Sequence, residues 1–487
     1  MAPTRCVSGI RAAVGVWGQY PHTIIMEAPD DSPVAGMTLW GGRFGEGPDE
    51  VLWRYTATTE DRRLLPWDIR GSMAHVTMLG SVGILDENEA AQLLEGLRTV
   101  AAEAAEGTFE FRETDEDVHS AVERRLIELV GPVGGKVHTG RSRNDQIALD
   151  LRMYLADAAV GRVSELRALA GVLADLAERH ADDVVPSYTH LQQAQAISLG
   201  HHFCAHAWWA LRNAERFSDA RRRVAVSPLG ASASGGSSLG LDPARSAEAI
   251  GWEAHFSNSL DAVAARDFAS EYGFCCAQAM VDLSRLAEEL ILWATSEFGW
   301  VTFSDAFTTG SSALPQKKNP DIAELARGRS AGAIGSLTAL LTLQKGLPLA
   351  YNRDLQEDKV HVFGLDDTLA ATLEALTGML ANARFHPPAP SSFTTALDLA
   401  EALVGRGVPF RESHKAVGAL VARLIDEGRQ LGDAEEADLT AVDSRFRPED
   451  LELLDPAESV RRRRSPGGGS PESVLRQVEA IRNQIAD

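Results

Sequence analysis

The sequence predicts a mainly α-helical protein in three parts, with a long helical bundle at its centre. Only six of the 21 prolines fall between residues 133 and 386. An interior proline removes a hydrogen bond and clashes with the preceding turn, so long proline-free segments are what long helices require. Apolar residues in this stretch recur at steps of three and four, which is the period of a helix. We find no alternating β pattern of useful length.

The first part, residues 37–140, is expected to combine loops with short helices. Its clearest element is the helix 86–107, where Asp86 and Glu89 form a capping-box start. Residues 1–36 precede this part, and we expect them to be a disordered N-terminal extension.

The central part, residues 141–389, is predicted to contain five long helices. The first, from Gln146 to His180, would be roughly 50 Å long at 1.5 Å per residue, far beyond the average globular helix. The other four are expected at about 190–225, 262–296, 321–345 and 353–382. Long helices in this number indicate a bundle. The last part, residues 390–487, should contain short proline-bounded helices and end in a helix that starts at Pro471.

Charge, hydropathy and cysteine usage exclude several functional classes. The chain has 47 Lys and Arg against 69 Asp and Glu, a formal net charge of −22. It therefore lacks the basic footprint of a protein that binds nucleic acid or an anionic membrane. No run approaches the ~18 apolar residues of a membrane-spanning helix. The four cysteines contain no CxxC pair, which indicates a reducing, cytoplasmic setting.

The strongest chemical signal is the segment 310–321, GSSALPQKKNPD. A glycine-rich and hydroxyl-rich loop with two lysines leads here into a helix, with Asn319 expected as N-cap and Pro320 at the first helical position. A serine, a cation and a helix N-terminus are the ingredients for activating a hydroxyl and holding a carboxylate. A surface loop before a capped helix would show the same composition.

Three further polar segments are candidates for binding. Residues 136–146, KVHTGRSRNDQ, precede the longest helix, and their arginines could clamp a dicarboxylate. Ordinary capping by Asn144 or Asp145 is the alternative. Residues 186–192, PSYTHLQ, place a Thr-His pair where we expect a helix to open, a position at which a lone histidine is more often structural. Residues 345–359, KGLPLAYNRDLQEDK, are equally compatible with a solvated helix start.

Two other patterns bear on cofactors. His202 and His206 are four residues apart on a predicted helix, a spacing that can hold a metal ion. No third ligand is apparent, however, and Trp208 and Trp209 favour packing. The glycine and serine run at 230–240 lacks the GxGxxG spacing and follows no strand, which disfavours dinucleotide binding. We expect neither a metal nor an organic cofactor.

From about Leu39 to its C-terminus, the chain resembles the argininosuccinate lyase family, within the fumarase/aspartase superfamily. The GSSxxPxKxNP loop is shared across the superfamily, so it indicates only the class of chemistry. The more selective motifs are LWGGRF, DEDVHSAVERRL (115–126), HTGRSRNDQ (138–146), THLQQAQ (189–195), NSLDAVAARDF (258–268) and LPLAYNRDLQEDK (347–359).

The resemblance implies reversible elimination of L-argininosuccinate to L-arginine and fumarate in arginine biosynthesis, without a cofactor. It also implies a homotetramer in which each active site is assembled from three chains. Such sharing would explain why the polar segments are far apart in sequence, and helices this long cannot bury all their apolar residues within one subunit. The alternatives are a sister lyase that releases fumarate from another N-substituted aspartate and an inactive structural homologue.

By motif, the resemblance assigns Ser311 to act at carbon, with Lys317 and Asn319 stabilising the intermediate. His190, oriented by Glu324 through a carboxylate–imidazole pair, would handle the other proton. Which of Ser311 and His190 is the acid and which the base stays open. An inactive homologue would be expected to have lost one of the four groups Ser311, His190, Lys317 and Glu324, and all are present. Substrate binding is assigned to Thr189, Ser142, Arg143, Asn144, Tyr351, Gln356 and Lys359, with Asp61 and Asp117 as contributors.

One segment departs from the family pattern. The family usually carries a substrate-contacting serine shortly before the residue equivalent to Asp61. Here the segment 55–61 reads YTATTED, and by spacing Ala57 takes the place of that serine. Either Thr56 or Thr58 substitutes for it, or the amino-acid end of the substrate is held less firmly.

Overall fold

The structure, a computed structural model, describes residues 49–486, so the predicted N-terminal extension at 1–36 lies outside the described residues. The chain divides into two compact units, one of Met1–Ala57 with Arg112–Glu116 and one of Thr58–Phe111 with Asp117–Asp487. The described part of the smaller unit contains α1 (Glu50–Thr56), which is capped by the Asp49 side chain. Within that unit, Trp53 Nε1 donates a hydrogen bond to the carbonyl oxygen of Glu113 at 3.3 Å.

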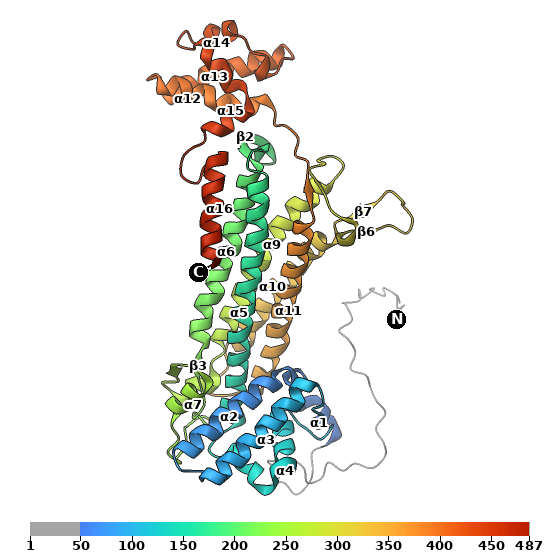
Figure 1. The fold of residues 1–487 in the computed structure, drawn as a ribbon, viewed down its shortest axis with the longest axis vertical. Coiled ribbons are helices and arrows are strands. Elements are labelled where there is room, and N and C mark those ends of the chain that lie inside the picture. Colours follow the sequence, from blue (N-terminus) through green and yellow to red (C-terminus); the bar gives the residue numbers. More distant parts are fainter. Residues whose placement is uncertain (1–48, 487) are drawn as a thin grey trace, which may run out of the picture. The chain divides into compact units, whose positions relative to one another are not determined.

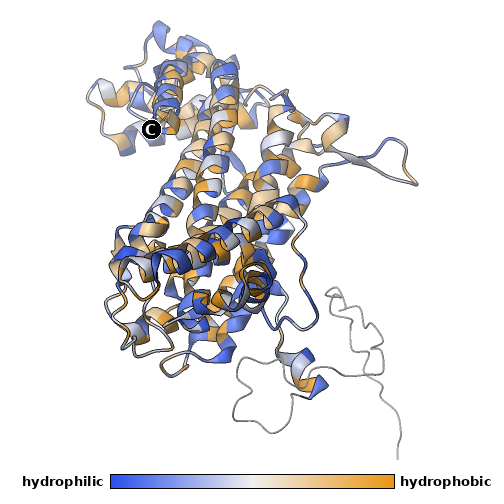
Figure 2. Cartoon of the chain, turned by 60° about the horizontal axis from the view of Figure 1, so that its bottom comes forward, coloured by the Kyte–Doolittle hydropathy of each residue, from blue (hydrophilic) through white to orange (hydrophobic). Residues whose placement is uncertain are grey.

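The five long helices predicted for the centre of the chain are present in the larger unit (Figure 1). They are α5 (Arg143–Arg179), α6 (Leu199–Val224), α9 (Asp267–Ala294), α10 (Asp321–Gln344) and α11 (Asp358–Ala381). α5 packs along α6, and α9 packs along α10 and α11. Hydrophobic and hydrophilic residues alternate along these helices (Figure 2), and the apolar side chains between them form one large core.

The prediction of a helix from about residue 190 is wrong at its start. Residues 184–198 instead form an antiparallel hairpin of β1 (Val184–Thr189) and β2 (Gln192–Ser198). β-branched Val184 and Val185 favour a strand, and the turn places His190 at φ 55° and Leu191 at φ 57°, which no helix tolerates. The expectation of no useful β pattern therefore also fails for this segment, because a hairpin this short carries too little alternation to be recognised.

Shorter helices surround the start of α5. They are α2 (Leu65–Ser81), α3 (Glu87–Glu106), α4 (Val118–Val130), α7 (Pro243–Ile250) and α8 (Ser259–Ala264). The predicted capping box at Asp86 and Glu89 is confirmed, and α3 ends at Gly107, whose φ of 71° suits a residue without a side chain. α2, α3 and α4 share a separate apolar core.

The C-terminal part contains α12 (Ala396–Gly405), α13 (Phe410–Asp426), α14 (Glu436–Val442), α15 (Pro456–Arg462) and α16 (Pro471–Ala486). The predicted helix start at Pro471 is confirmed. α12, α13 and α14 enclose their own apolar core. α16 instead packs along α5 and α6, where Val474, Val478 and Ile481 join the core of the bundle.

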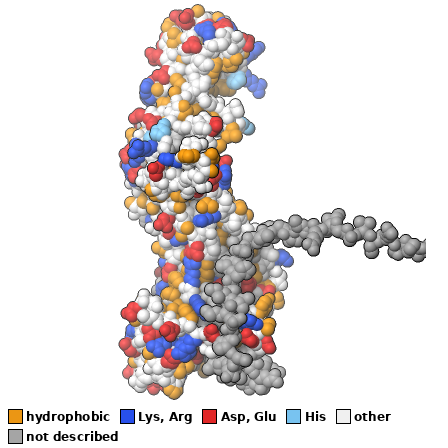
Figure 3. All heavy atoms as spheres, turned by 90° about the vertical axis from the view of Figure 1, so that its right-hand side faces the viewer, with side chains coloured by type: hydrophobic (Ala, Val, Ile, Leu, Met, Phe, Trp, Pro, Cys, Tyr) orange, Lys and Arg blue, Asp and Glu red, His pale blue; other side chains and the backbone are white. Residues whose placement is uncertain are grey.

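The remaining elements are short. β3 (Val226–Ser227) pairs in parallel with β4 (Ala254–His255), while β5 (Val301–Thr302) with β8 (Arg384–Phe385) and β6 (Thr309–Gly310) with β7 (Lys318–Asn319) pair antiparallel. The 3-10 helices are η2 (Glu60–Leu64), η3 (Gly131–His138), η4 (Asp305–Phe307), η5 (Arg353–Glu357), η6 (Ser392–Thr395), η7 (Leu431–Asp433) and η8 (Pro448–Leu454). Among the described helices, none combines the length and apolarity needed to cross a membrane. Acidic and basic side chains are interspersed over the face drawn in Figure 3.

Candidate active site

Most of the predicted substrate-binding residues lie at the end of the bundle where α5 begins. Ser142, at the start of α5, is its N-cap, with its hydroxyl accepting a hydrogen bond from Asn144 N at 3.2 Å. Asp145 accepts from Ser142 N at 2.9 Å and, with its other oxygen, from Gly230 N and Ser232 N at 3.2 and 2.8 Å. The N-cap is thus Ser142 rather than Asn144 or Asp145, but Asp145 does take part in capping: at the third helical position it completes a capping box and also ties α5 to the glycine-rich loop.

Arg143 and Asp117 form an ion pair at this end of the bundle. Arg143 Nη1 lies 2.9 Å from Asp117 Oδ2, and the same aspartate caps α4 by accepting from Ser120 N at 2.8 Å. The Asn144 side chain donates to the carbonyl oxygen of Ala233 at 2.9 Å. The polar groups of the segment 138–146 are thus held in place by neighbouring helix starts and loops.

Asp61 lies in η2 and is almost fully buried, at 2% exposure. Its Oδ2 accepts from Val118 N at 3.4 Å, while Oδ1 has no hydrogen-bond partner among the described residues. Burial raises the pKa of Asp61 to about 6, although the nearby His119 and Lys359 act in the opposite direction. A buried carboxylate oxygen without a partner, close to Asp117, is suited to accept a donor group from a ligand.

A buried polar network that the sequence reasoning missed lies beneath this segment. His119 Nδ1 is 2.8 Å from Asp68 Oδ1, and Gln146 Nε2 donates to the same oxygen at 2.5 Å. Asp150 Oδ2 lies 3.6 Å from the same nitrogen, His119 Nδ1. Burial lowers the pKa of His119, but the charge and hydrogen bond of Asp68, together with the charges of Asp117 and Asp61, outweigh burial and raise the pKa. The one available signal was His119 itself, a polar residue inside the motif at 115–126.

A second missed network holds Lys359. Arg266 Nε donates to Asp358 Oδ2 at 2.6 Å, and Lys359 Nζ donates to Asp358 Oδ1 at 2.9 Å. All three residues are at most 2% exposed. Burial would raise the pKa of Asp358, but Lys359 and Arg266 outweigh it and hold the pKa below its usual value. One buried carboxylate thus neutralises part of the charge of two buried cations.

We expect Asp358→Asn to lower the free energy of unfolding by about 3–5 kcal/mol, because it leaves two buried cations without their counter-ion. The urea midpoint of the variant, compared with that of the wild type, measures the effect. Asp354→Asn makes the same charge change at an exposed position of η5 and is the matched control. Equal midpoints for the two variants would show that Arg266 and Lys359 do not depend on Asp358.

Tyr351 and Gln356 complete this group. Burial raises the pKa of Tyr351, and Arg266, Asp358 and Asp117 are among its charged neighbours. Gln356 Oε1 accepts from Arg353 Nε at 2.9 Å in η5. The structure therefore places eight predicted residues around the start of α5 and the loop before α11. They are Asp61, Asp117, Ser142, Arg143, Asn144, Tyr351, Gln356 and Lys359.

Thr189 and His190 lie elsewhere, at the exposed turn of the β1–β2 hairpin. The prediction that this pair opens a helix is wrong, since α6 begins only at Leu199. No hydrogen bond to the His190 ring is found within residues 49–486. In Figure 1 the hairpin lies at the far end of the bundle from α2, α3 and α4.

Ser311, Lys317 and Asn319 belong to a third group, in and around the β6–β7 loop. Ser311 Oγ accepts from Ala313 N and Leu314 N at 3.2 and 3.1 Å. Asn319 is not the N-cap that was predicted: it pairs in β7, and Pro320 occupies the cap before α10.

Glu324 lies on the exposed side of the first turn of α10. Among the described residues of one chain, no hydrogen bond or ion pair joins Glu324 to His190. One chain thus presents three separate groups of predicted residues, and their convergence and individual roles stay predictions.

Comparisons with known proteins identify the class to which this arrangement belongs. The family model described as lyase matches residues 42–335, and the model described as argininosuccinate lyase C-terminal matches residues 393–461. The fold and the polar segments thus define a lyase of the fumarase/aspartase superfamily.

Two relatives narrow this class. Argininosuccinate lyase of Acidothermus cellulolyticus is 47% identical over 477 residues, covering 96% of this chain and 98% of its own. That of Thermobifida fusca is 48% identical over 466 residues, covering 94% and 97%. The chain belongs to the argininosuccinate lyase family. Among solved structures, EDDS lyase in complex with formate is similar, with 29% identity, a TM-score of 0.76 and coverage of 89% and 88%. A variant of EDDS lyase has been solved with bound fumarate.

Proposed function

We propose that this chain catalyses the reversible elimination of L-argininosuccinate to L-arginine and fumarate, in arginine biosynthesis in the cytoplasm. The observation that carries the proposal is the 47% identity to an argininosuccinate lyase over 96% of the chain. The chemical groups that the reaction needs, Ser311, His190, Lys317 and Glu324, are all present.

The reaction removes a proton from the carbon next to a carboxylate and then expels the guanidino nitrogen. Because such a proton is only weakly acidic, the site must supply a base and also stabilise the charge that spreads onto the carboxylate. Ser311 acts at carbon, and Lys317 and Asn319 stabilise the intermediate. His190, oriented by Glu324, handles the other proton. The group around the start of α5 binds the carboxylates and the amino-acid end of the substrate, together with Thr189.

The active form is a homotetramer in which three chains contribute to each site. Two features support this part of the proposal. Within one chain, the predicted site residues form three separate groups: at the start of α5, at the β1–β2 turn, and in and around the β6–β7 loop. In addition, α10 exposes large apolar side chains, with Leu325, Ile334 and Leu341 at 53%, 49% and 56% exposure. Large apolar side chains exposed on a bundle helix are typical of a subunit interface.

Absorbance in the ultraviolet band of fumarate tests the reaction directly. Addition of argininosuccinate should produce fumarate, whereas adenylosuccinate and aspartate, as controls, should not. Fumarate release from one of the controls and none from argininosuccinate would overturn the proposal.

A sister lyase that acts on another N-substituted aspartate is the second candidate. It is favoured by Ala57, which takes the place of the family's substrate-contacting serine. In addition, EDDS lyase, an enzyme with a different name, has a similar fold at 29% identity.

Restoring the hydroxyl with Ala57→Ser should lower the Michaelis constant for argininosuccinate threefold to tenfold, at nearly constant turnover. The reason is that one neutral hydrogen bond is worth roughly 0.5–1.5 kcal/mol, and this one acts on the amino-acid end, away from the elimination. Steady-state kinetics measure both constants. A higher Michaelis constant in the variant would mean that Ala57 belongs to a pocket shaped for a different amine, and the sister-lyase function would then take precedence.

A further inference from the structure

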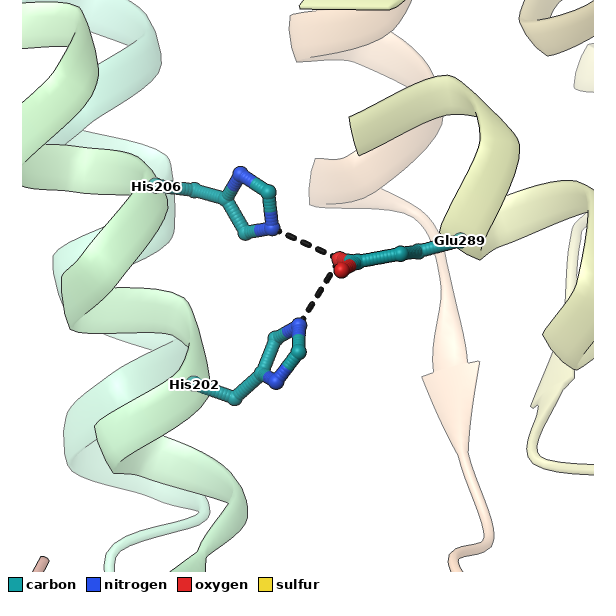
Figure 4. A group of neighbouring side chains, drawn as sticks. All are labelled: His202, His206 and Glu289. Carbon is teal, nitrogen blue, oxygen red and sulfur yellow. Dashed lines mark hydrogen bonds and ion pairs between the residues drawn. The ribbon is translucent and has the colours of Figure 1, made fainter. Parts of the chain in front are cut away.

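Two histidines and a glutamate join α6 to α9, outside the three groups of predicted site residues. His202 and His206 lie one turn apart on α6, and Glu289 projects toward both from α9 (Figure 4). The same oxygen, Glu289 Oε2, lies 2.8 Å from His202 Nε2 and 2.7 Å from His206 Nε2. The third side chain of the cluster, which the sequence alone did not identify, is therefore Glu289. It follows His202 in the chain by 87 residues.

We propose that His202, His206 and Glu289 bind a divalent transition-metal ion of the zinc type, which cross-links α6 to α9. Two imidazole nitrogens and one carboxylate oxygen are a donor set that zinc uses when it has three protein ligands, with water in the fourth position.

The distances within the group fit such an ion after small side-chain rotations. The three ligand atoms lie within 4.8 Å of one another. Around a tetrahedral zinc ion with bonds of 2.0–2.1 Å, neighbouring ligand atoms are about 3.3 Å apart. The hydrogen-bonded atoms at 2.7 and 2.8 Å therefore need to separate by only about half an ångström.

Access and support also suit a metal site. The His206 side chain is 5% exposed, whereas those of His202 and Glu289 are 26% and 36% exposed, so that an ion can enter from solvent. The His202 ring packs against Trp293 and the His206 ring against Trp209, each with ring centroids 5.0 Å apart. The packing against a tryptophan that the sequence suggested is thus present for Trp209. It holds the His206 ring in place and does not prevent that ring from acting as a metal ligand.

The charged groups and burial around the three side chains influence which protonation states they adopt, and therefore how well they can bind a metal ion. Metal binding requires a neutral imidazole and an ionised carboxylate. Burial lowers the pKa of His206, and hydrogen bonds from the two histidines keep the pKa of Glu289 low in spite of burial. Arg285, whose guanidinium lies 4.1 Å from the centre of the Trp209 ring, is a cation near His206. Its charge disfavours protonation of His206, and so helps to keep the imidazole neutral.

One other group of described residues has a similar composition, namely Asp68, His119 and Asp150. Their side chains are at most 5% exposed, and Asp68 is already engaged by Gln146. This group supports the segment at the start of α5 and offers an ion no route from solvent.

Titration of the metal-free full chain with Co²⁺ and with Zn²⁺ tests the proposal. We expect one ion per chain, with a cobalt visible spectrum of the tetrahedral type. Glu289→Gln and His202→Gln should each weaken binding at least about tenfold. His201→Gln is the matched control, because this neighbouring ring lies beside Gly469 instead. Absence of binding, or binding that Glu289→Gln and His202→Gln leave unchanged, would overturn the proposal.

Thermal unfolding provides a readout that does not depend on the spectrum. An ion that binds only the folded state raises the melting temperature. Zn²⁺ should therefore raise the melting temperature of the wild type and of His201→Gln, but not that of Glu289→Gln. An equal rise in all three proteins would place the ion elsewhere and overturn the proposal.

Discussion

Replacing Ser311 by alanine is expected to lower the turnover number at least ~100-fold, the usual scale for removal of a positioned proton-transfer group. That loss corresponds to about 2.7 kcal/mol of transition-state stabilisation. The proposed elimination requires a group that acts at carbon, and Ser311 is the residue that the superfamily motif assigns to it. Turnover of argininosuccinate, followed by fumarate absorbance, measures the effect, and size-exclusion chromatography checks that the assembly is unchanged.

The structure shows which control this experiment needs. Ser311 Oγ also accepts two backbone hydrogen bonds, from Ala313 and Leu314, so its removal loosens a turn as well as deleting a hydroxyl. Ser312→Ala deletes the neighbouring hydroxyl of the same loop and should leave turnover within a factor of a few. Near-normal turnover in Ser311→Ala would remove Ser311 from the mechanism. An equal loss in both variants would point to the shape of the loop instead.

Features that depend on neighbouring residues were predicted well from the sequence. The capping box at Asp86 and Glu89 and the start of α16 at Pro471 each rest on a few consecutive residues, and both are confirmed. The five long helices follow from apolar periodicity over many turns. The β1–β2 hairpin was missed because its strands are short, and because Gln192 and its neighbours show no clear apolar alternation.

Contacts between distant helices were not predictable in the same way. Arg266 and Asp358 are 92 residues apart, and Glu289 is 87 residues from His202. Whether such side chains meet depends on how the helices are rotated and shifted along one another, which a local pattern does not encode. The motifs at 258–268 and 347–359 contain both Arg266 and Asp358, yet spacing alone does not show that they form a pair.

Mixing two inactive variants should restore activity if the site is shared between chains. His190→Ala and Ser311→Ala subunits are each expected to be nearly inactive. His190 lies on the β1–β2 turn and Ser311 in the β6–β7 loop, and no hydrogen bond joins them among the described residues of one chain. If each site takes these residues from different chains, random reassembly after denaturation leaves about a quarter of the sites with neither defect. Activity should then rise from near zero to about a quarter of the wild-type value.

The hairpin supplies a matched control for this experiment. Thr189 and His190 are adjacent on the same turn, so every site receives both from one chain. A mixture of Thr189→Ala and His190→Ala subunits should therefore stay as inactive as its parents, because each site inherits one defect or the other. Each variant denatured and renatured alone gives the baseline. If the first mixture forms mixed tetramers without recovering activity, His190 and Ser311 act from the same chain, and the proposal of sites shared between chains in this way is wrong.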